Sequence, residues 1–113
     1  MKEFIKEVLK HNGWLSGYYD YLDGDIMALL RGEEYFNSVV EFGDTLTLFE
    51  NLKRFVGVFK YRELVFFNDP QYGCFVYRED NPENYIEHLS IDAMEFKDFN
   101  KLVNELLRKI HCS

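Results

Sequence analysis

Few residues in this chain are of the kinds that crosslink small proteins or build metal and phosphate sites. It has two cysteines, Cys74 and Cys112, which are too few for a disulfide framework. Its three histidines are dispersed, and no pair of cysteines or histidines has the spacing of zinc ligands. Its seven glycines are scattered, so no glycine-rich loop is available to hold phosphate groups. We therefore expect neither a metal nor a cofactor.

Long apolar runs are also missing. No stretch approaches the roughly 18 apolar residues that a membrane-spanning helix requires. Charges interrupt the first ten residues too often for a signal peptide. Cys74 lies in an apolar run, where a buried free thiol is the usual state. A reducing, cytoplasmic setting without membrane association is the resulting expectation.

Aromatic side chains are what the chain has in abundance. Its 113 residues include 11 Phe, 8 Tyr and 1 Trp, and 47% of all residues are hydrophobic. Large rings bury much area each, so a chain of this length can build one core without crosslinks. We expect a single domain that spans residues 1–113.

Acidic residues outnumber basic ones, which gives a net charge of −7. Residues 11–52 hold eight acids and one base, and residues 79–98 hold seven acids and one base. Between them, residues 53–62 hold four bases and no acid. Such a chain repels nucleic-acid phosphates as a whole and favours basic partners. Plain solvation of a charged surface is the alternative explanation.

Helical spacing marks both ends of the chain. At the start, Phe4 and Val8 share one face of a helix predicted over residues 2–11. Near the end, Asp92 and Glu95 are placed like a capping box, which opens a final helix. The apolar stripe of that helix consists of Phe96, Phe99, Val103, Leu106 and Ile110, widened by Leu102 and Leu107. Such a stripe predicts an amphipathic helix packed on a sheet.

Between these helices the pattern changes to short β-like runs. Residues 35–42 and 45–49 flank Gly43-Asp44, which favours a tight hairpin. A helix over residues 45–55 is the competing interpretation, because the apolar residues there also keep helical spacing. The hairpin is the preferred prediction.

The remaining strands are predicted from β-branched and aromatic runs separated by turn formers. They cover residues 55–59, 64–67, 74–77 and 85–91, with a loop over residues 68–73. Residues 25–31 fit either a strand or a short helix. Because short connections make neighbouring strands antiparallel, the predicted fold class is α+β. It comprises an antiparallel meander of about five strands, an N-terminal helix and a C-terminal amphipathic helix on the sheet.

No motif for catalysis or metal binding is present. No glycine-framed nucleophile occurs, and His88 beside Glu87 is the one base that invites inspection. On a strand, those two neighbours point to opposite faces, which argues against a dyad. Asp20, Asp23 and Asp25 lie close together, but the spacing of oxygen donors is not that of an EF-hand loop. We expect a protein that is not an enzyme.

Protein binding has the best support in the sequence. Aromatic residues that anchor interfaces are intermixed with acids that steer a basic partner. The candidate partner-binding residues are Trp14, Tyr18, Tyr19, Asp20, Tyr21, Asp23, Asp25, Glu33 and Glu34. The competing interpretation places the rings of this set in the core.

Nucleic-acid or small-molecule binding is an alternative carried by residues 53–62, called the basic strip below. Its bases are Lys53, Arg54, Lys60 and Arg62, and aromatic residues lie between them. Surfaces that bind single-stranded nucleic acids combine aromatic rings, which stack on nucleobases, with cations, which hold phosphates. The overall negative charge argues against direct nucleic-acid binding.

The function expected from these patterns is that of an acidic, non-enzymatic module that binds a basic protein. Small acidic α+β proteins include phage-encoded inhibitors of bacterial defence systems, immunity proteins and secretion chaperones. These classes share size, charge and layout with the chain, and fold alone does not determine function. An inhibitor of a nucleic-acid-binding protein would place carboxylates where phosphates normally sit. The sequence leaves the partner's identity and the oligomeric state open.

Overall fold

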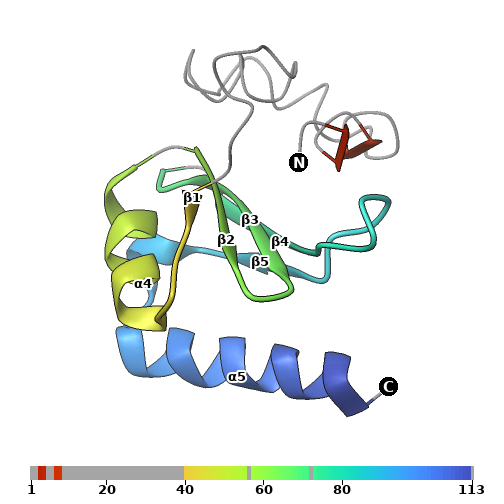
Figure 1. Cartoon of the computed structure of the whole chain (residues 1–113). Helices are drawn as coiled ribbons and strands as arrows, with labels where there is room; N and C mark the ends of the chain where they lie inside the picture. Colours follow the sequence, from red (N-terminus) through yellow and green to blue (C-terminus); the bar gives the residue numbers. More distant parts are fainter. Residues whose placement is uncertain (1–2, 5–6, 9–39, 56, 72, 113) are drawn as a thin grey trace.

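The computed structural model describes residues 3–4, 7–8, 40–55, 57–71 and 73–112. In this part of the chain, one five-stranded sheet packs against two helices (Figure 1). The elements are β1 (Val40–Glu41), α4 (Thr45–Arg54), β2 (Gly57–Tyr61), β3 (Leu64–Asp69), β4 (Gly73–Arg78), β5 (Glu87–Leu89), the 3-10 turn η3 (Ile91–Ala93) and α5 (Phe96–Cys112). The α+β class is therefore confirmed.

The sheet is mixed, so the prediction of a purely antiparallel meander was wrong. Its strands lie in the order β1-β2-β3-β4-β5, and the last three pairings are antiparallel. β1 pairs with β2 in parallel, with Val40 opposite Phe59. Two consecutive parallel strands need a crossover connection, and α4 supplies it.

Residues 45–54 form α4, so the preferred hairpin was wrong and the competing helix is confirmed. Asp44 is the N-cap of α4 and fixes where the helix begins. Its carboxylate accepts a hydrogen bond of 2.7 Å from the Thr47 backbone N–H. Leu48 and Leu52 then point into the core. Leu46 is 49% exposed, which shows that its alternation with the threonines was not a strand pattern.

The loop predicted over residues 68–73 begins too early, because Asn68 and Asp69 belong to β3. Asn68 is fully buried there, and its side-chain amide donates to the carbonyl oxygens of Leu52 and Phe55, both at 2.8 Å. These carbonyls lie at the C-terminal end of α4, where a helix lacks internal donors. A turn-forming residue thus serves as a helix cap from a neighbouring strand.

The main core lies between the sheet and the two helices. Inward residues of β2, β3 and β4 include Phe59, Phe66 and Val76, and they face the α5 stripe. Phe99, Val103, Leu106 and Leu107 of that stripe are buried, and Phe96, Leu102 and Ile110 are partly buried. The amphipathic prediction for α5 is confirmed. A hydrogen bond at 2.7 Å from Thr45 Oγ1 to Asn100 Oδ1 joins α4 to α5.

The predicted capping box at the start of α5 does not form in that register. Asp92 lies within η3, and α5 begins only at Phe96. Glu95 precedes the helix, and its carbonyl oxygen accepts the N–H groups of Asp98 and Phe99 at 3.1 Å. The 3-10 turn instead includes Asp92, which the sequence assigned to the cap of the helix.

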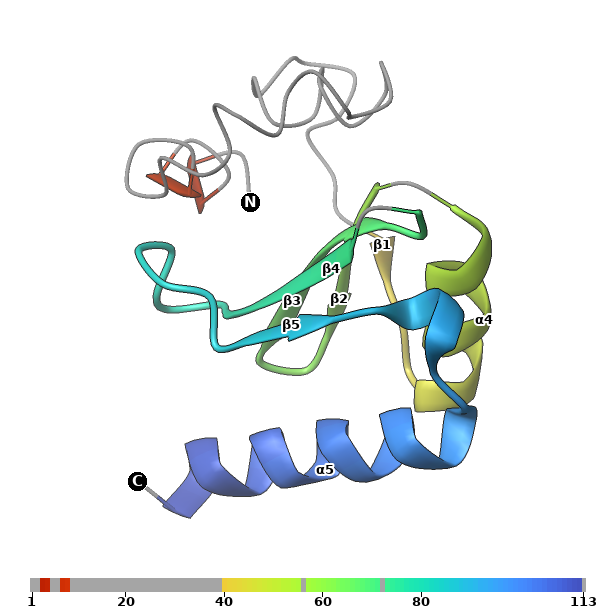
Figure 2. The ribbon, with the colours of Figure 1, turned by 180° about the vertical axis from the view of Figure 1, so that it is seen from behind.

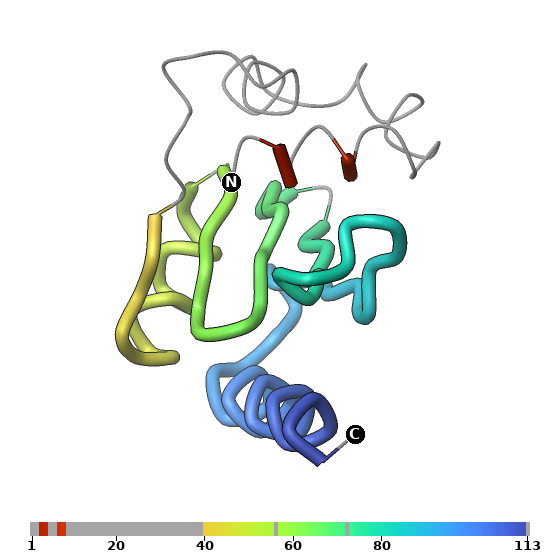
Figure 3. The backbone as a smooth tube through the Cα atoms, turned by 45° about the vertical axis from the view of Figure 1, so that its right-hand side comes forward, coloured from red at the N-terminus to blue at the C-terminus, as the bar shows by residue number. Residues whose placement is uncertain are grey.

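The opposite face of the sheet is also apolar. Phe4 contacts the rings of Phe67 and Tyr77, with centroids 6.4 and 6.2 Å away. Val8 is fully buried, and both residues are helical, as predicted for this end of the chain. Figure 3 shows them on the side of the sheet away from α5. β3 and β4 are therefore buried on both faces.

Candidate interaction surface

The partner-binding residues predicted from the sequence lie outside the described residues. This holds for all nine, from Trp14 to Glu34, and also for the helix or strand expected over residues 25–31. Their role stays a prediction. The described surface of the sheet and its two helices is formed by residues 40–55, 57–71 and 73–112.

The basic strip is divided by β2. Lys53 and Arg54 end α4, where cations complement the helix dipole. Lys60 and Arg62 lie at the far end of β2 and in the turn after it. Lys60 is held between two acids, with its Nζ 3.6 Å from Glu41 and 3.3 Å from Glu79. The four cations do not form one surface.

The aromatic rings of the basic strip are either buried or covered by an arginine side chain. Phe59 and Tyr61 are buried in the core. Phe55 is 50% exposed, but the Arg54 guanidinium lies over its ring at 5.5 Å. Arg62 likewise covers Tyr61 at 5.4 Å. A platform for stacked bases needs open ring faces, and this arrangement does not supply a row of them.

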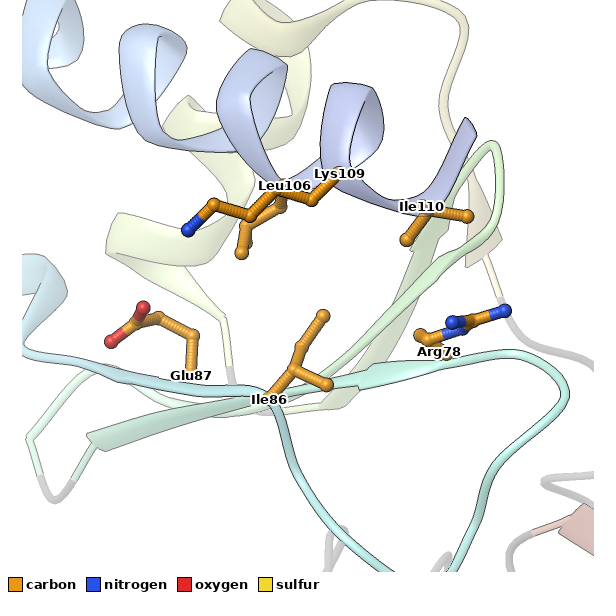
Figure 4. Close-up of a pocket in the computed structure, with 6 residues that line it drawn as sticks. All are labelled: Arg78, Ile86, Glu87, Leu106, Lys109 and Ile110. Carbon is orange, nitrogen blue, oxygen red and sulfur yellow. The ribbon is translucent and has the colours of Figure 1, made fainter. Parts of the chain in front are cut away.

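A pocket of about 280 Å³ opens between α5 and the β4–β5 edge of the sheet. Its lining consists of Arg78, Ile86, Glu87, Leu106, Lys109 and Ile110. In Figure 4, Ile86 points toward α5 and faces the aliphatic side chains of Leu106 and Ile110. Lys109 and Glu87 extend toward one end of the pocket, and Arg78 lies at the other. The pocket thus has an aliphatic centre and charged ends.

The loop between β4 and β5, residues 79–86, is called the acidic loop, and its last residue, Ile86, lines this pocket. The loop extends beyond the sheet, on the same side as the C-terminal end of α5 (Figures 1 and 2). Glu79, Asp80 and Glu83 are exposed on it. Arg78 Nε and Nη2 each donate to Asp80 at 3.0 Å, and the Asn81 side chain accepts the Glu83 N–H. These bonds hold the loop in a defined shape.

Aromatic side chains cluster where the acidic loop meets the face of the sheet opposite α5, called the outer face below. Tyr85 is 43% exposed and packs edge-on against Phe75, with centroids 5.2 Å apart. His88 stacks flat on the same Phe75 ring at 4.2 Å. Burial, together with the nearby Tyr85, raises the pKa of Tyr77 above its usual value. An exposed tyrosine on a packed aromatic base is typical of a contact residue.

The groups considered for catalysis do not assemble. Glu87 lines the pocket beside α5, whereas His88 stacks on the outer face, so the two point apart as predicted. Cys74 is fully buried, and burial raises the pKa of its thiol, which disfavours the reactive thiolate. Within residues 40–112 and the described N-terminal residues, no group of His, Cys, Asp or Glu side chains could hold a metal ion. Nor does any helix of the described part combine the length and apolar character needed to cross a membrane.

Sequence reasoning missed the pocket. Leu106 and Ile110 were predicted as core stripe, and Glu87 drew attention only as a neighbour of His88. The pocket residues come from two segments, 78–87 and 106–110, which only the packing of α5 across the sheet brings together. The acid surplus of residues 79–98 was the one visible signal.

Comparison with known protein families, curated proteins and solved structures gives no match to this chain.

Proposed function

We propose that this chain is a non-enzymatic acidic module that binds a basic protein. The observation that carries the proposal is the acidic loop, where Glu79, Asp80 and Glu83 are exposed beside the exposed ring of Tyr85. Two of these acids also pair within the chain, Glu79 with Lys60 and Asp80 with Arg78, at the exposed surface. Carboxylates steer a basic surface toward the site, and a tyrosine contributes contact area on docking. The loop's internal hydrogen bonds reduce the entropy lost on binding.

An inhibitor of a nucleic-acid-binding protein fits this description best. Such a target has a basic surface shaped for phosphates, and the net charge of −7 lets the chain compete for it. An immunity protein or a secretion-type chaperone would bind through the same kind of contact. The basic strip supports the nucleic-acid alternative less well, because Lys60 lies between Glu41 and Glu79 and the four cations are divided by β2.

Capture from the native host tests the proposal. Tagged full-length chain is expected to retain one stoichiometric basic protein at moderate salt, identified by mass spectrometry. Recovery of nucleic acid alone, or of no stoichiometric protein, would contradict the proposal.

The captured protein then allows a kinetic test. We expect neutralisation of Asp20, Asp23 and Asp25 to asparagine, or of the three acids of the acidic loop to their amides, to slow association about tenfold at low salt. A matched triple variant in η3 and around the start of α5 (Asp92→Asn, Glu95→Gln, Asp98→Asn) makes the same change in net charge. If it slows association equally, only total charge matters and no local surface is involved.

A further inference from the structure

The pocket between α5 and the β4–β5 edge of the sheet combines an aliphatic centre with an acid and a base at one end (Figure 4). We propose that it binds a free α-amino acid with a branched aliphatic side chain, such as leucine. The ligand's ammonium group pairs with Glu87 and its carboxylate with Lys109. This inference goes beyond the proposed function, because it concerns a small molecule and does not depend on the basic partner.

The centre of the pocket selects an aliphatic group. Ile86 points toward α5, where the side chains of Leu106 and Ile110 face it (Figure 4). Burial of methyl groups among these side chains is favourable, and burial of an amide or a hydroxyl group is not. The volume of about 280 Å³ is just below the roughly 300 Å³ at which sites for drug-sized ligands begin. An amino acid is smaller than such ligands, so the pocket has the size that it needs.

One end of the pocket carries two opposite charges that can receive a ligand. Glu87 and Lys109 both extend toward this end (Figure 4). Within the described part of the chain, neither forms an ion pair with the other or with a third residue. Glu87 is half-buried on β5, where a carboxylate loses hydration that no partner replaces. The head group of a free amino acid carries both an ammonium and a carboxylate, so it pairs with both residues at once.

The opposite end of the pocket does not compete for this head group. Arg78 lines that end, but its guanidinium donates two hydrogen bonds to Asp80, both at 3.0 Å. The lining contains two bases and one acid, and one of the bases is thereby offset within the chain. The charges left for a ligand are those of Glu87 and Lys109, which sum to zero. A zwitterion matches them, whereas a ligand with a single charge leaves one of the two residues without a partner.

Titration of the full chain with L-leucine, followed by backbone NMR, tests the assignment. Saturable shifts are expected at residues 86, 87, 106, 109 and 110, with a dissociation constant on the order of 1 mM. L-Asparagine is the first comparison, because it keeps the head group and has nearly the same shape, with an amide in place of the two methyl groups. It should bind about tenfold more weakly. Equal affinity for the two amino acids, or no saturable shift with leucine, would overturn the inference.

Two analogues that each lack one charge test the head group. Isocaproate has no ammonium group, and isopentylamine has no carboxylate. Each should bind about fivefold more weakly than leucine, because Glu87 or Lys109 then lacks its partner. If isocaproate binds as tightly as leucine, the pocket selects an aliphatic anion and the amino-acid assignment is wrong. If isopentylamine does so, the carboxylate contact with Lys109 is wrong.

Charge variants locate the two contacts. Glu87→Gln should weaken leucine binding about fivefold without weakening that of isocaproate, and Lys109→Gln should do the same without weakening that of isopentylamine. Glu105→Gln and Lys101→Gln on α5 are the matched controls, because neither residue lines the pocket. Both controls should bind leucine as the unchanged chain does. Equal losses in the variants and their controls would contradict contacts made at the pocket.

A second pair of variants tests the aliphatic wall. Ile110 and Leu102 are both partly buried on α5, but only Ile110 lines the pocket. Leucine affinity should fall about tenfold in Ile110→Ser and stay unchanged in Leu102→Ser. Equal losses would show a general loss of structure and overturn the pocket contact. Failure of leucine to bind leaves the proposed function standing, because that proposal is tested by capture of a basic protein.

Discussion

Gly73 opens β4 in a backbone conformation that suits glycine, with φ at 134°. A Cβ atom at this position would also collide with Nε2 of His88, whose ring is stacked on Phe75. We expect Gly73→Ala to destabilise the protein by about 2 kcal/mol, through backbone strain and displacement of His88. Urea unfolding measures the loss. In a His88→Ala background the loss should be smaller, and equal losses would show that the imidazole is not involved.

Asn68 is the residue through which β3 completes α4. Replacement by alanine removes two hydrogen bonds, a buried one to the Leu52 carbonyl and a part-buried one to the Phe55 carbonyl, so we expect a loss of about 2–3 kcal/mol. Asn68→Asp should cost more, because a carboxylate would face those oxygens. Asn104→Ala is the control, since its similar bond to the Asn100 carbonyl is exposed. Comparable losses at positions 68 and 104 in chemical unfolding would refute the capping role.

At the scale of elements, the C-terminal end of α5 is tied to the β2–β3 turn by His111, whose Nε2 lies 3.2 Å from Glu63 Oε2. This contact with His111 holds the pKa of Glu63 below its ordinary value of 4.5, with Arg62 adding a smaller effect. A lowered folded pKa contributes stability that is present above the unfolded value and lost as pH falls through the folded one.

The stability of the unchanged chain should therefore fall further between neutral and acid pH than that of Glu63→Gln. His111→Ala should remove the same part of the pH dependence, and the double variant should add nothing. Urea midpoints across the pH range give the comparison. Additive effects of the two substitutions would show that the residues act independently.

The charge distribution of the whole molecule disfavours nucleic-acid binding, because the net charge is −7 and the cations of the basic strip are separated by β2. We expect the full chain to leave the anisotropy of a fluorescent single-stranded oligonucleotide unchanged at low salt. Binding that disappears in the variant Arg54→Ala, Lys60→Ala, Arg62→Ala would restore the nucleic-acid alternative. A matched variant on α5 (Lys97→Ala, Lys101→Ala, Arg108→Ala) separates loss of that strip from loss of positive charge in general.

The two edge strands of the sheet limit how a partner can bind. Among the residues that the structure describes, β1 has two residues and β5 has three, so neither described edge of the sheet offers a long template for pairing with another chain. Any partner would meet side chains and the acidic loop more readily than backbone.

The sequence by itself determined the α+β class, the final helix and its buried stripe, three central strands and the buried free Cys74. Each of these rests on a local pattern: a helical stripe, runs of β-branched and aromatic residues, or a thiol within an apolar run. Such local patterns predict the structure correctly because they determine which face of a helix or strand must be buried.

Only the tertiary structure decided the rest. Residues 45–54 satisfied both a strand and a helix pattern. The Asp44 cap and the crossover needed between the parallel strands β1 and β2 selected the helix. Asn68 was predicted as a loop residue, and only the packing of α4 beside β3 gives its amide the carbonyls at the end of the helix as partners. The pocket needs residues 78–87 and 106–110 at once, and no local pattern records that α5 crosses the sheet at that edge. Contacts between distant segments depend on packing, which a local pattern does not encode.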